Sequence, residues 1–232
     1  NLEDIDRWLL DAEEKGELSI DTETTSLNPH LAELVGISLA TGIGKSCYIP
    51  LKHISKEVLD RNKVIRKIKP ILEDKSIKKI GQNIKYDYIV FYHQGIRMNS
   101  MEDTMLISYV LDAGKNRHNM DTLSEIHLGH KTISYKDLVG TGKKEINFRE
   151  VDVEKARDYA SEDADITFRL YKKFYKSLKE EKMINIYEVF EKPMIKLLSK
   201  LEMNGVKVNS SYLKKLSKKF EDRLRKKEKE IY

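Results

Sequence analysis

The sequence predicts an α/β fold. Segments with the apolar spacing of helices alternate with short segments that have the period-two spacing of strands, as a sheet covered by helices requires. Apolar residues make up 40% of the 232 residues, enough to bury one good-sized core plus a small appendage. No apolar run approaches the roughly 18 residues of a membrane span, and no signal peptide is visible. We therefore expect no membrane association.

The first quarter of the chain predicts a helix followed by three strands. An amphipathic pattern covers residues 3–14, and Gly16 then precedes a strand at 18–23. Residues 34–40 and 45–49 form two further strand patterns around a glycine-containing turn, which indicates a hairpin. These strands supply the antiparallel part of the expected sheet.

The first predicted strand carries two acidic residues on one face. Side chains alternate across a strand, so Leu18, Ile20 and Thr22 face one side while Asp21 and Glu23 face the other. We therefore expect the carboxylates of Asp21 and Glu23 to project together.

A third acid follows the next strand pattern, at residues 76–80. Gly81 ends that strand, and a helix then begins in which Ile84, Tyr88 and Phe91 form the apolar stripe. Asp87 lies three residues after Ile84 and four before Phe91. Its side chain is thus expected to border the buried face.

A long helix predicted at residues 151–182 carries the fourth acid. Tyr159 and Asp163 are four residues apart and share a face, which Ile166 and Leu170 continue. Asp163 is therefore predicted on the inward side. Three neighbouring acids fall on other faces and are expected to be solvated: Asp158, Glu162 and Asp165.

Together the four acids indicate a metal site. An ionised carboxylate on a buried stripe costs several kcal/mol unless it is paired or bound to a metal, and no cationic residue shares the stripe of Asp163. Acids brought together from separate motifs are what a pair of divalent cations needs to hydrolyse a phosphodiester. One such acid alone would more simply be explained as a helix cap or half of an ion pair.

The order of the motifs DTETTSL, GQNIKYD and YASEDAD resembles the DEDD exonuclease superfamily, in its subgroup with a tyrosine four residues before the last aspartate. The stretches DTMLISYVLDAGKNRHNMDTL, HKTISY and EKPMIKLLSKLEMNGVKV are similar to the bacterial DNA polymerase I family, family A. The resemblance implies a proofreading 3′→5′ exonuclease domain at 1–185, with a ribonuclease H-like mixed sheet flanked by helices. It further implies that residues 186–232 are the helical start of the polymerase (thumb) domain.

The resemblance also implies roles for individual residues. Asp21, Glu23 and Asp163 would bind one divalent ion, Asp21 would bridge to a second, and Asp87 would hold that second ion through water. Tyr159 and Glu23 would orient the attacking water. The ions would be Mg²⁺ or Mn²⁺, with Zn²⁺ as an alternative at one site. The residues implied to contact the substrate are Thr24, Leu27, Gln82, Asn83, Arg117 and Tyr135.

The expected partners are the single-stranded 3′ end of DNA and the remainder of a polymerase chain, with the protein itself a monomer. A net charge of +5 and a pI near 8.9 are compatible with a nucleic-acid partner. The single cysteine, Cys47, excludes an internal disulfide framework and fits a reducing compartment, the cytoplasm.

The last part of the chain predicts a helix at 187–203, a turn at Asn204-Gly205, a short strand at 206–208 and a charged helix that runs to Tyr232.

Two alternatives to the DNA exonuclease remain. A ribonuclease D-like enzyme that trims RNA shares the acids and the tyrosine. A catalytically silent module would bind DNA or brace the polymerase without hydrolysis.

Overall fold

The computed structural model describes residues 1–54 and 58–231 and contains a mixed, five-stranded sheet with strand order β3-β2-β1-β4-β5. β1 pairs antiparallel with β2 and parallel with β4; β2 pairs antiparallel with β3, and β4 pairs parallel with β5. The strands are β1 (Glu17–Thr24), β2 (Leu34–Gly42), β3 (Lys45–Pro50), β4 (Lys78–Gly81) and β5 (Met101–Asp103). The predicted α/β fold with a mixed sheet is confirmed.

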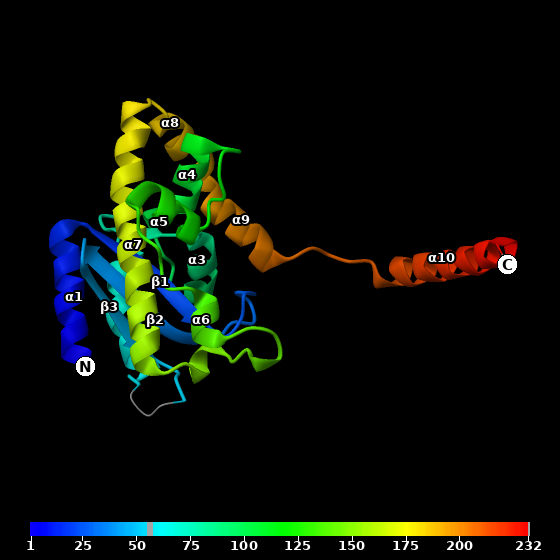
Figure 1. Cartoon of the computed structure of the whole chain (residues 1–232), viewed down its shortest axis with the longest axis horizontal. Helices are drawn as coiled ribbons and strands as arrows, with labels where there is room; N and C mark the ends of the chain where they lie inside the picture. Colours follow the sequence, from blue (N-terminus) through cyan, green and yellow to red (C-terminus); the bar gives the residue numbers. More distant parts are fainter. Residues whose placement is uncertain (55–57, 232) are drawn as a thin grey trace. The chain divides into compact units, whose positions relative to one another are not determined.

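Helices cover both faces of this sheet (Figure 1). They are α1 (Leu2–Lys15), α2 (Arg61–Glu73), α3 (Ile84–His93), α4 (Thr104–Asp112), α5 (Met120–Leu128), α6 (Tyr135–Val139) and α7 (Val153–Glu180). The long α7 crosses one face in contact with β1, β2, β3 and β4, and α4 and α5 pack against it. α1 and α3 contact strands on the other face, and α2 packs on α1.

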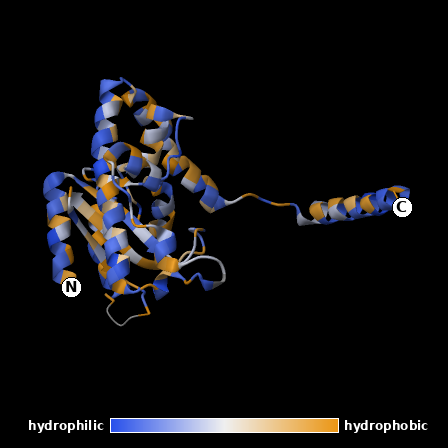
Figure 2. Cartoon of the chain, in the orientation of Figure 1, coloured by the Kyte–Doolittle hydropathy of each residue, from blue (hydrophilic) through white to orange (hydrophobic). Residues whose placement is uncertain are grey.

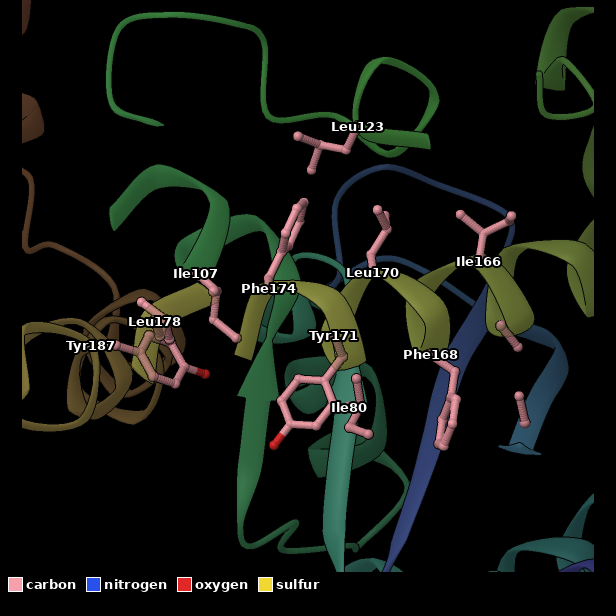
Figure 3. Packing of buried hydrophobic residues seen from close by; sticks show 12 residues of the cluster. Ile80, Ile107, Leu123, Ile166, Phe168, Leu170, Tyr171, Phe174, Leu178 and Tyr187 are labelled. Carbon is pink, nitrogen blue, oxygen red and sulfur yellow. The ribbon is translucent and has the colours of Figure 1, made fainter. Parts of the chain in front are cut away.

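Apolar side chains on two sides of α7 form much of the core. Figure 3 shows Phe168 and Tyr171 directed toward the sheet, where Ile80 of β4 lies, and Phe174 directed toward Leu123 of α5. All of these side chains are buried. Because α7 is buried on two sides, the position of its polar residues relative to the sheet is fixed within narrow limits. Figure 2 shows hydrophilic and hydrophobic residues alternating along the helices, as an amphipathic pattern requires.

The helical segment after α7 contains a π-helical turn. α8 (Ile184–Ile186), the π-helix η3 (Tyr187–Glu191) and α9 (Lys192–Asn204) follow one another without a break. Pro193 supplies a physical reason for the wider turn: it has no N–H to donate, and its ring excludes the carbonyl one turn before it. The predicted helix at 187–203 is therefore present, with a local change of pitch.

Two further predictions concern the last part of the chain. Val206 and Val208 are exposed and belong to no strand, so the predicted strand at 206–208 is wrong. A strand needs a neighbour to satisfy its backbone, and no strand of the described residues pairs with this segment. α10 (Ser210–Ile231) follows; Tyr232, to which we predicted the helix to run, lies outside the described residues.

The chain separates into two compact units, residues 1–200 and the residues from 201 onward. The first unit contains the sheet and every residue predicted for the site. The domain boundary predicted between 185 and 186 stays a prediction. No helix of the described residues is long and apolar enough to cross a membrane.

Candidate metal centre

Three carboxylates meet where α7 passes over β1. Asp21 and Glu23 come from β1 and Asp163 from α7, and one oxygen of each lies within 4.8 Å of the others. The alternation of β1 places both strand acids on the α7 side. The packing of α7 against four strands brings Asp163 to them. The sequence-based prediction that these three acids converge agrees with this geometry.

Asp87 reaches the same region from the opposite face of the sheet. Its Oδ1 accepts hydrogen bonds from the backbone N–H of Thr22 at 3.0 Å and from the Thr22 hydroxyl at 2.5 Å. Thr22 lies between Asp21 and Glu23 but points to the other side of β1. Asp87 is buried, as predicted, and its oxygens lie outside the group formed by the other three acids.

The helix that carries Asp87 begins at a fixed point. Asn83 has a left-handed backbone (φ 58°), and its N–H and that of Ile84 donate to the Asp103 carboxylate at 3.1 and 3.0 Å. A Cβ on Gly81 would lie 2.8 Å from the Ile84 side chain, so only glycine permits this close turn. Asp103, which the sequence reading did not single out, thus sets the start of α3 and with it the position of Asp87.

The electrostatics of the cluster are unfavourable in the absence of a cation. Burial raises the pKa of Asp21 to about 6. Burial, followed by repulsion from neighbouring acids, raises the pKa of Glu23, Asp87 and Asp163 well above the ordinary range. The groups that most oppose these shifts are backbone amides and hydroxyls of the described residues, and none of them is a lysine or an arginine.

One oxygen of the cluster has no partner at all among the described residues. Asp163 Oδ1 is buried and accepts no hydrogen bond. A buried acceptor without a donor costs roughly 1–3 kcal/mol, and more when it is charged. The three carboxylates, of which Asp163 has this oxygen without a donor, form the all-oxygen donor set that hard cations such as Mg²⁺ and Mn²⁺ prefer. The residues present therefore fit the divalent ions expected from the sequence.

Tyr159 lies one turn before Asp163 and contacts it. Burial, followed by the charges of Asp163, Glu23 and Asp21, raises the pKa of the phenol well above its ordinary value. The hydroxyl therefore keeps its proton. Tyr159 also packs in an aromatic group with Phe148 and Tyr135, with ring centroids 6.1 Å away in both cases.

Tyr135, one of the predicted substrate contacts, is the exposed member of this aromatic group. Its ring stacks on Phe148 with an interplanar angle of 6°, and its side chain is 43% exposed. The structure thus brings Tyr135 next to Tyr159 although they are far apart in sequence. Phe148 was not predicted. A lone phenylalanine in a loop gives no sequence signal that distinguishes such a support from ordinary packing.

The other predicted substrate contacts lie on the segments next to the acids. Leu27 is 96% exposed in the loop after β1, and the Thr24 hydroxyl lies 2.5 Å from that of Tyr86. Gln82 donates to the backbone carbonyl of His118 at 2.8 Å, which ties the segment that contains Arg117 to the start of α3. Arg117 and Asn83 are both exposed. Their contact with a substrate stays a prediction.

The prediction that Asp165 is solvated is wrong. Asp165 is only 9% exposed; it accepts from the backbone N–H of Gly44 at 2.6 Å and pairs with Arg169 at 2.7 Å. It faces the turn of the β2–β3 hairpin, where a backbone donor needs an acceptor. Glu162 is partly exposed and accepts from His130 at 2.7 Å and from the Ile133 N–H at 2.6 Å, whereas Asp158 is solvated as predicted.

Comparisons with known sequences identify the family and relatives of this chain. A family model described as 3′-5′ exonuclease matches residues 1–179. The chain is 40% identical to DNA polymerase I of Rhizobium leguminosarum, with 98% of this chain and 24% of the relative covered. It is 39% identical to DNA polymerase I of Pseudomonas aeruginosa, with 90% of this chain and 24% of the relative covered. The chain therefore spans about a quarter of the length of these relatives.

Solved structures share the fold. The POL domain of Pol1 from M. smegmatis, in complex with DNA primer-template and dNTP, is similar with a TM-score of 0.73 at 17% identity, covering 95% of this chain and 34% of that one. Brucella melitensis NrnC is similar with a TM-score of 0.67 at 22% identity, covering 84% and 89%. Escherichia coli RNase D, an exoribonuclease, gives 0.61 at 17% identity, covering 84% and 49%. These likenesses confirm the expected ribonuclease H-like fold.

Proposed function

Because the chain belongs to the 3′-5′ exonuclease family, we propose that it removes mismatched nucleotides from the 3′ end of DNA by metal-dependent hydrolysis, as the proofreading part of a bacterial DNA polymerase I. One observation carries the proposal. Asp21, Glu23 and Asp163 converge with an orphaned buried oxygen, and Asp87 is held beside them. Such a site needs cations before a polyanionic substrate can approach it.

The four acids would together hold two ions. Asp21, Glu23 and Asp163 would hold the first, and Asp21 with Asp87 would hold the second. When bound, two divalent cations supply an activated water at neutral pH and neutralise the charge that builds on the transferring phosphate. Mg²⁺ and Mn²⁺ fit the oxygen donors, and Zn²⁺ remains an alternative at one of the two positions.

In this proposal Tyr159 and Glu23 would orient the attacking water. The Tyr159 hydroxyl keeps its proton because the surrounding acids and burial raise its pKa, so it acts as a hydrogen-bond donor and not as a base. Its ring is supported by Phe148. A fixed donor next to the acids would hold the water in line with the terminal phosphorus, which lowers the barrier by positioning.

The exposed side chains around the cluster would bind the DNA end. Tyr135 offers a ring for a base to stack on, which is worth roughly 1–3 kcal/mol per base. Leu27 would lie against the terminal base. Backbone and phosphate contacts are assigned to the remaining predicted residues: Thr24, Gln82, Asn83 and Arg117. Stacking and backbone contacts tolerate any sequence, so the end of any DNA strand can bind. A mismatched end frays more easily than a paired one, so it would reach this site more often.

The polymerase relatives favour DNA over RNA as the substrate. They are about 40% identical to this chain, whereas the RNase D likeness at 17% shows the fold alone. We place the activity in the bacterial cytoplasm, within a longer polymerase chain that works as a monomer.

The decisive experiment is cleavage of 5′-labelled single-stranded oligonucleotides of one sequence, as DNA and as RNA, with Mg²⁺ or Mn²⁺. A ladder that shortens from the 3′ end of the DNA, absent in chelator and in Asp21→Ala, would support the proposal. Preferential shortening of the RNA would favour the ribonuclease D-like alternative. Binding of intact DNA without cleavage would favour the silent module.

A further inference from the structure

Tyr48 of the edge strand β3 reaches across β2 toward the acid cluster. A Cβ built on Gly36 would lie 2.0 Å from the Tyr48 hydroxyl oxygen and 2.3 Å from Cζ, so the phenol fills the space that a side chain at position 36 would occupy. Gly36 is the residue directly opposite Glu23 in the β1–β2 register. Side chains opposite one another in a sheet have Cβ atoms about 5 Å apart. The cross-strand neighbour of Glu23 is therefore the end of the Tyr48 side chain.

Tyr48 is held in this place by His53. The Tyr48 hydroxyl lies 2.7 Å from His53 Nε2, and His53 Nδ1 lies 3.1 Å from the carbonyl oxygen of Val151. A carbonyl only accepts, so Nδ1 carries the proton and Nε2 accepts the hydrogen bond from Tyr48. The Tyr48 hydroxyl thus donates its proton in a hydrogen bond to His53. This proton is not shared with Glu23.

The same network connects the strand to α7. Val151 immediately precedes Asp152, the N-cap of α7, and that helix carries Tyr159 and Asp163. Tyr48 and Tyr159 both pack against the buried group of Val35, Val139, Phe148, Val151 and Ala156. Burial, and then the charges of Glu23 and Asp21, raise the pKa of the Tyr48 hydroxyl, which agrees with its closeness to the acids.

We propose that Tyr48, anchored by His53, is a positioning residue for Glu23. Its phenol forms the wall beside Glu23 on the β2 side and keeps the carboxylate turned toward Asp21 and Asp163. Because the phenol proton is bonded to His53, both oxygens of Glu23 stay available to a cation. This inference deepens the exonuclease proposal, on which its kinetic part rests, and concerns residues outside the four acids and Tyr159.

The test compares Tyr48→Leu, His53→Leu and His53→Gln with the unmodified chain. In Tyr48→Leu and His53→Leu we expect kcat to fall and the half-saturating Mn²⁺ concentration to rise by about tenfold, the usual effect of losing a residue that orients a metal ligand. KM for the oligonucleotide should stay unchanged, since no DNA contact is lost. His53→Gln keeps an acceptor near the Nε2 position. Its kcat and its half-saturating Mn²⁺ concentration should therefore be closer to those of the unmodified chain than to those of His53→Leu.

Tyr175→Phe is the control, because it removes a tyrosine hydroxyl whose partner is Glu188, and the backbone of Tyr175 lies about 18 Å along α7 from that of Asp163. A second readout needs no hydrolysis: the increase in melting temperature caused by Mn²⁺ alone should shrink in Tyr48→Leu and not in Tyr175→Phe. If both kcat and the Mn²⁺-induced increase are unchanged in Tyr48→Leu and His53→Leu, the inference is overturned. If the unmodified chain cleaves nothing but Tyr48→Leu still loses the Mn²⁺ effect, the exonuclease proposal fails while the positioning role stands.

Discussion

Two carboxylates of the unit formed by residues 1–200 are buried to a similar degree but differ in their hydrogen-bond partners. Glu102 of β5 is 2% exposed and Asp163 of α7 is 5% exposed. Glu102 accepts hydrogen bonds from Tyr187 at 2.9 Å and from Lys192 at 2.5 Å. Asp163 has one oxygen without a partner among the described residues and lies next to two further acids. Burial is thus the same, but only Glu102 is compensated by the chain itself.

The difference separates a structural acid from a functional one. Glu102 joins the helical segment after α7 to the sheet, and the Tyr187 hydroxyl that binds it also accepts from the N–H of Asp103. Its interactions are complete without any added group. Asp163 remains uncompensated until a cation arrives, and a site that binds metal must leave its ligands in that condition.

The largest expected effect is on hydrolysis. Asp163→Ala should lower kcat by on the order of 10³-fold or more, because the ion and the stabilisation it supplies are lost. Glu102→Gln removes a carboxylate of similar burial but should leave kcat per folded molecule within about twofold. Oligonucleotide cleavage on proteins matched by circular dichroism measures both. Equal losses in the two variants would contradict the distinction drawn here.

Breaking the compensated pair should act on stability instead. Lys192→Met leaves Glu102 buried without its cation and should lower the free energy of unfolding by about 3 kcal/mol. Lys176→Met is the matched control, since Lys176 pairs with Glu180 at 3.7 Å on the surface and little stability depends on it. Urea unfolding followed by fluorescence gives both values. A small effect of Lys192→Met would mean that Tyr187 alone satisfies Glu102.

The uncompensated cluster should make the metal-free protein sensitive to pH. The pKa of Asp21 is about 6 in the folded chain against an ordinary value of 3.8, so the folded protein binds more protons between these values and stability falls as the pH rises through them. That difference corresponds to about 3 kcal/mol at most. The raised pKa values of Glu23, Asp87 and Asp163 act in the same direction.

Thermal melting in chelator at about pH 4 and about pH 7.5 tests this expectation. Asp21→Asn cannot ionise at position 21, so its melting temperature should fall less than that of the unmodified chain, and added Mg²⁺ should remove most of the difference at the higher pH. A melting temperature that rises with pH in the unmodified chain, without metal, would show that the acids are compensated after all.

The sequence was sufficient to predict the acids and the strands that carry them, because both follow from local periodicity. Alternation in β1 places Asp21 beside Glu23, and helical spacing places Asp163 with Tyr159. Thr22, Asp103 and Phe148 could not be predicted in this way. Each acts on a residue distant in sequence, and such contacts depend on the packing of α3 and α7 against the sheet.

The errors have the same origin. Asp165 was assigned to a solvated face because helical spacing describes one helix in isolation, whereas the β2–β3 turn lies against that face in the folded chain. The strand predicted at 206–208, after the Asn204-Gly205 turn, fails because a segment forms a strand only where a neighbour offers hydrogen bonds. Local patterns therefore predict elements better than they predict what each element touches.

The smallest effect is expected at Tyr159, which connects the uncompensated cluster to the aromatic group. Tyr159→Phe keeps the ring on Phe148 but removes the hydroxyl proposed to orient the attacking water beside the acids, so kcat should fall by about tenfold while KM for DNA stays the same. The loss should be greatest at limiting metal, where the orientation of Asp163 matters most. Single-turnover cleavage across a Mn²⁺ titration measures it. A change in KM alone would instead assign Tyr159 to DNA binding, and the hydroxyl would then have no part in orienting water.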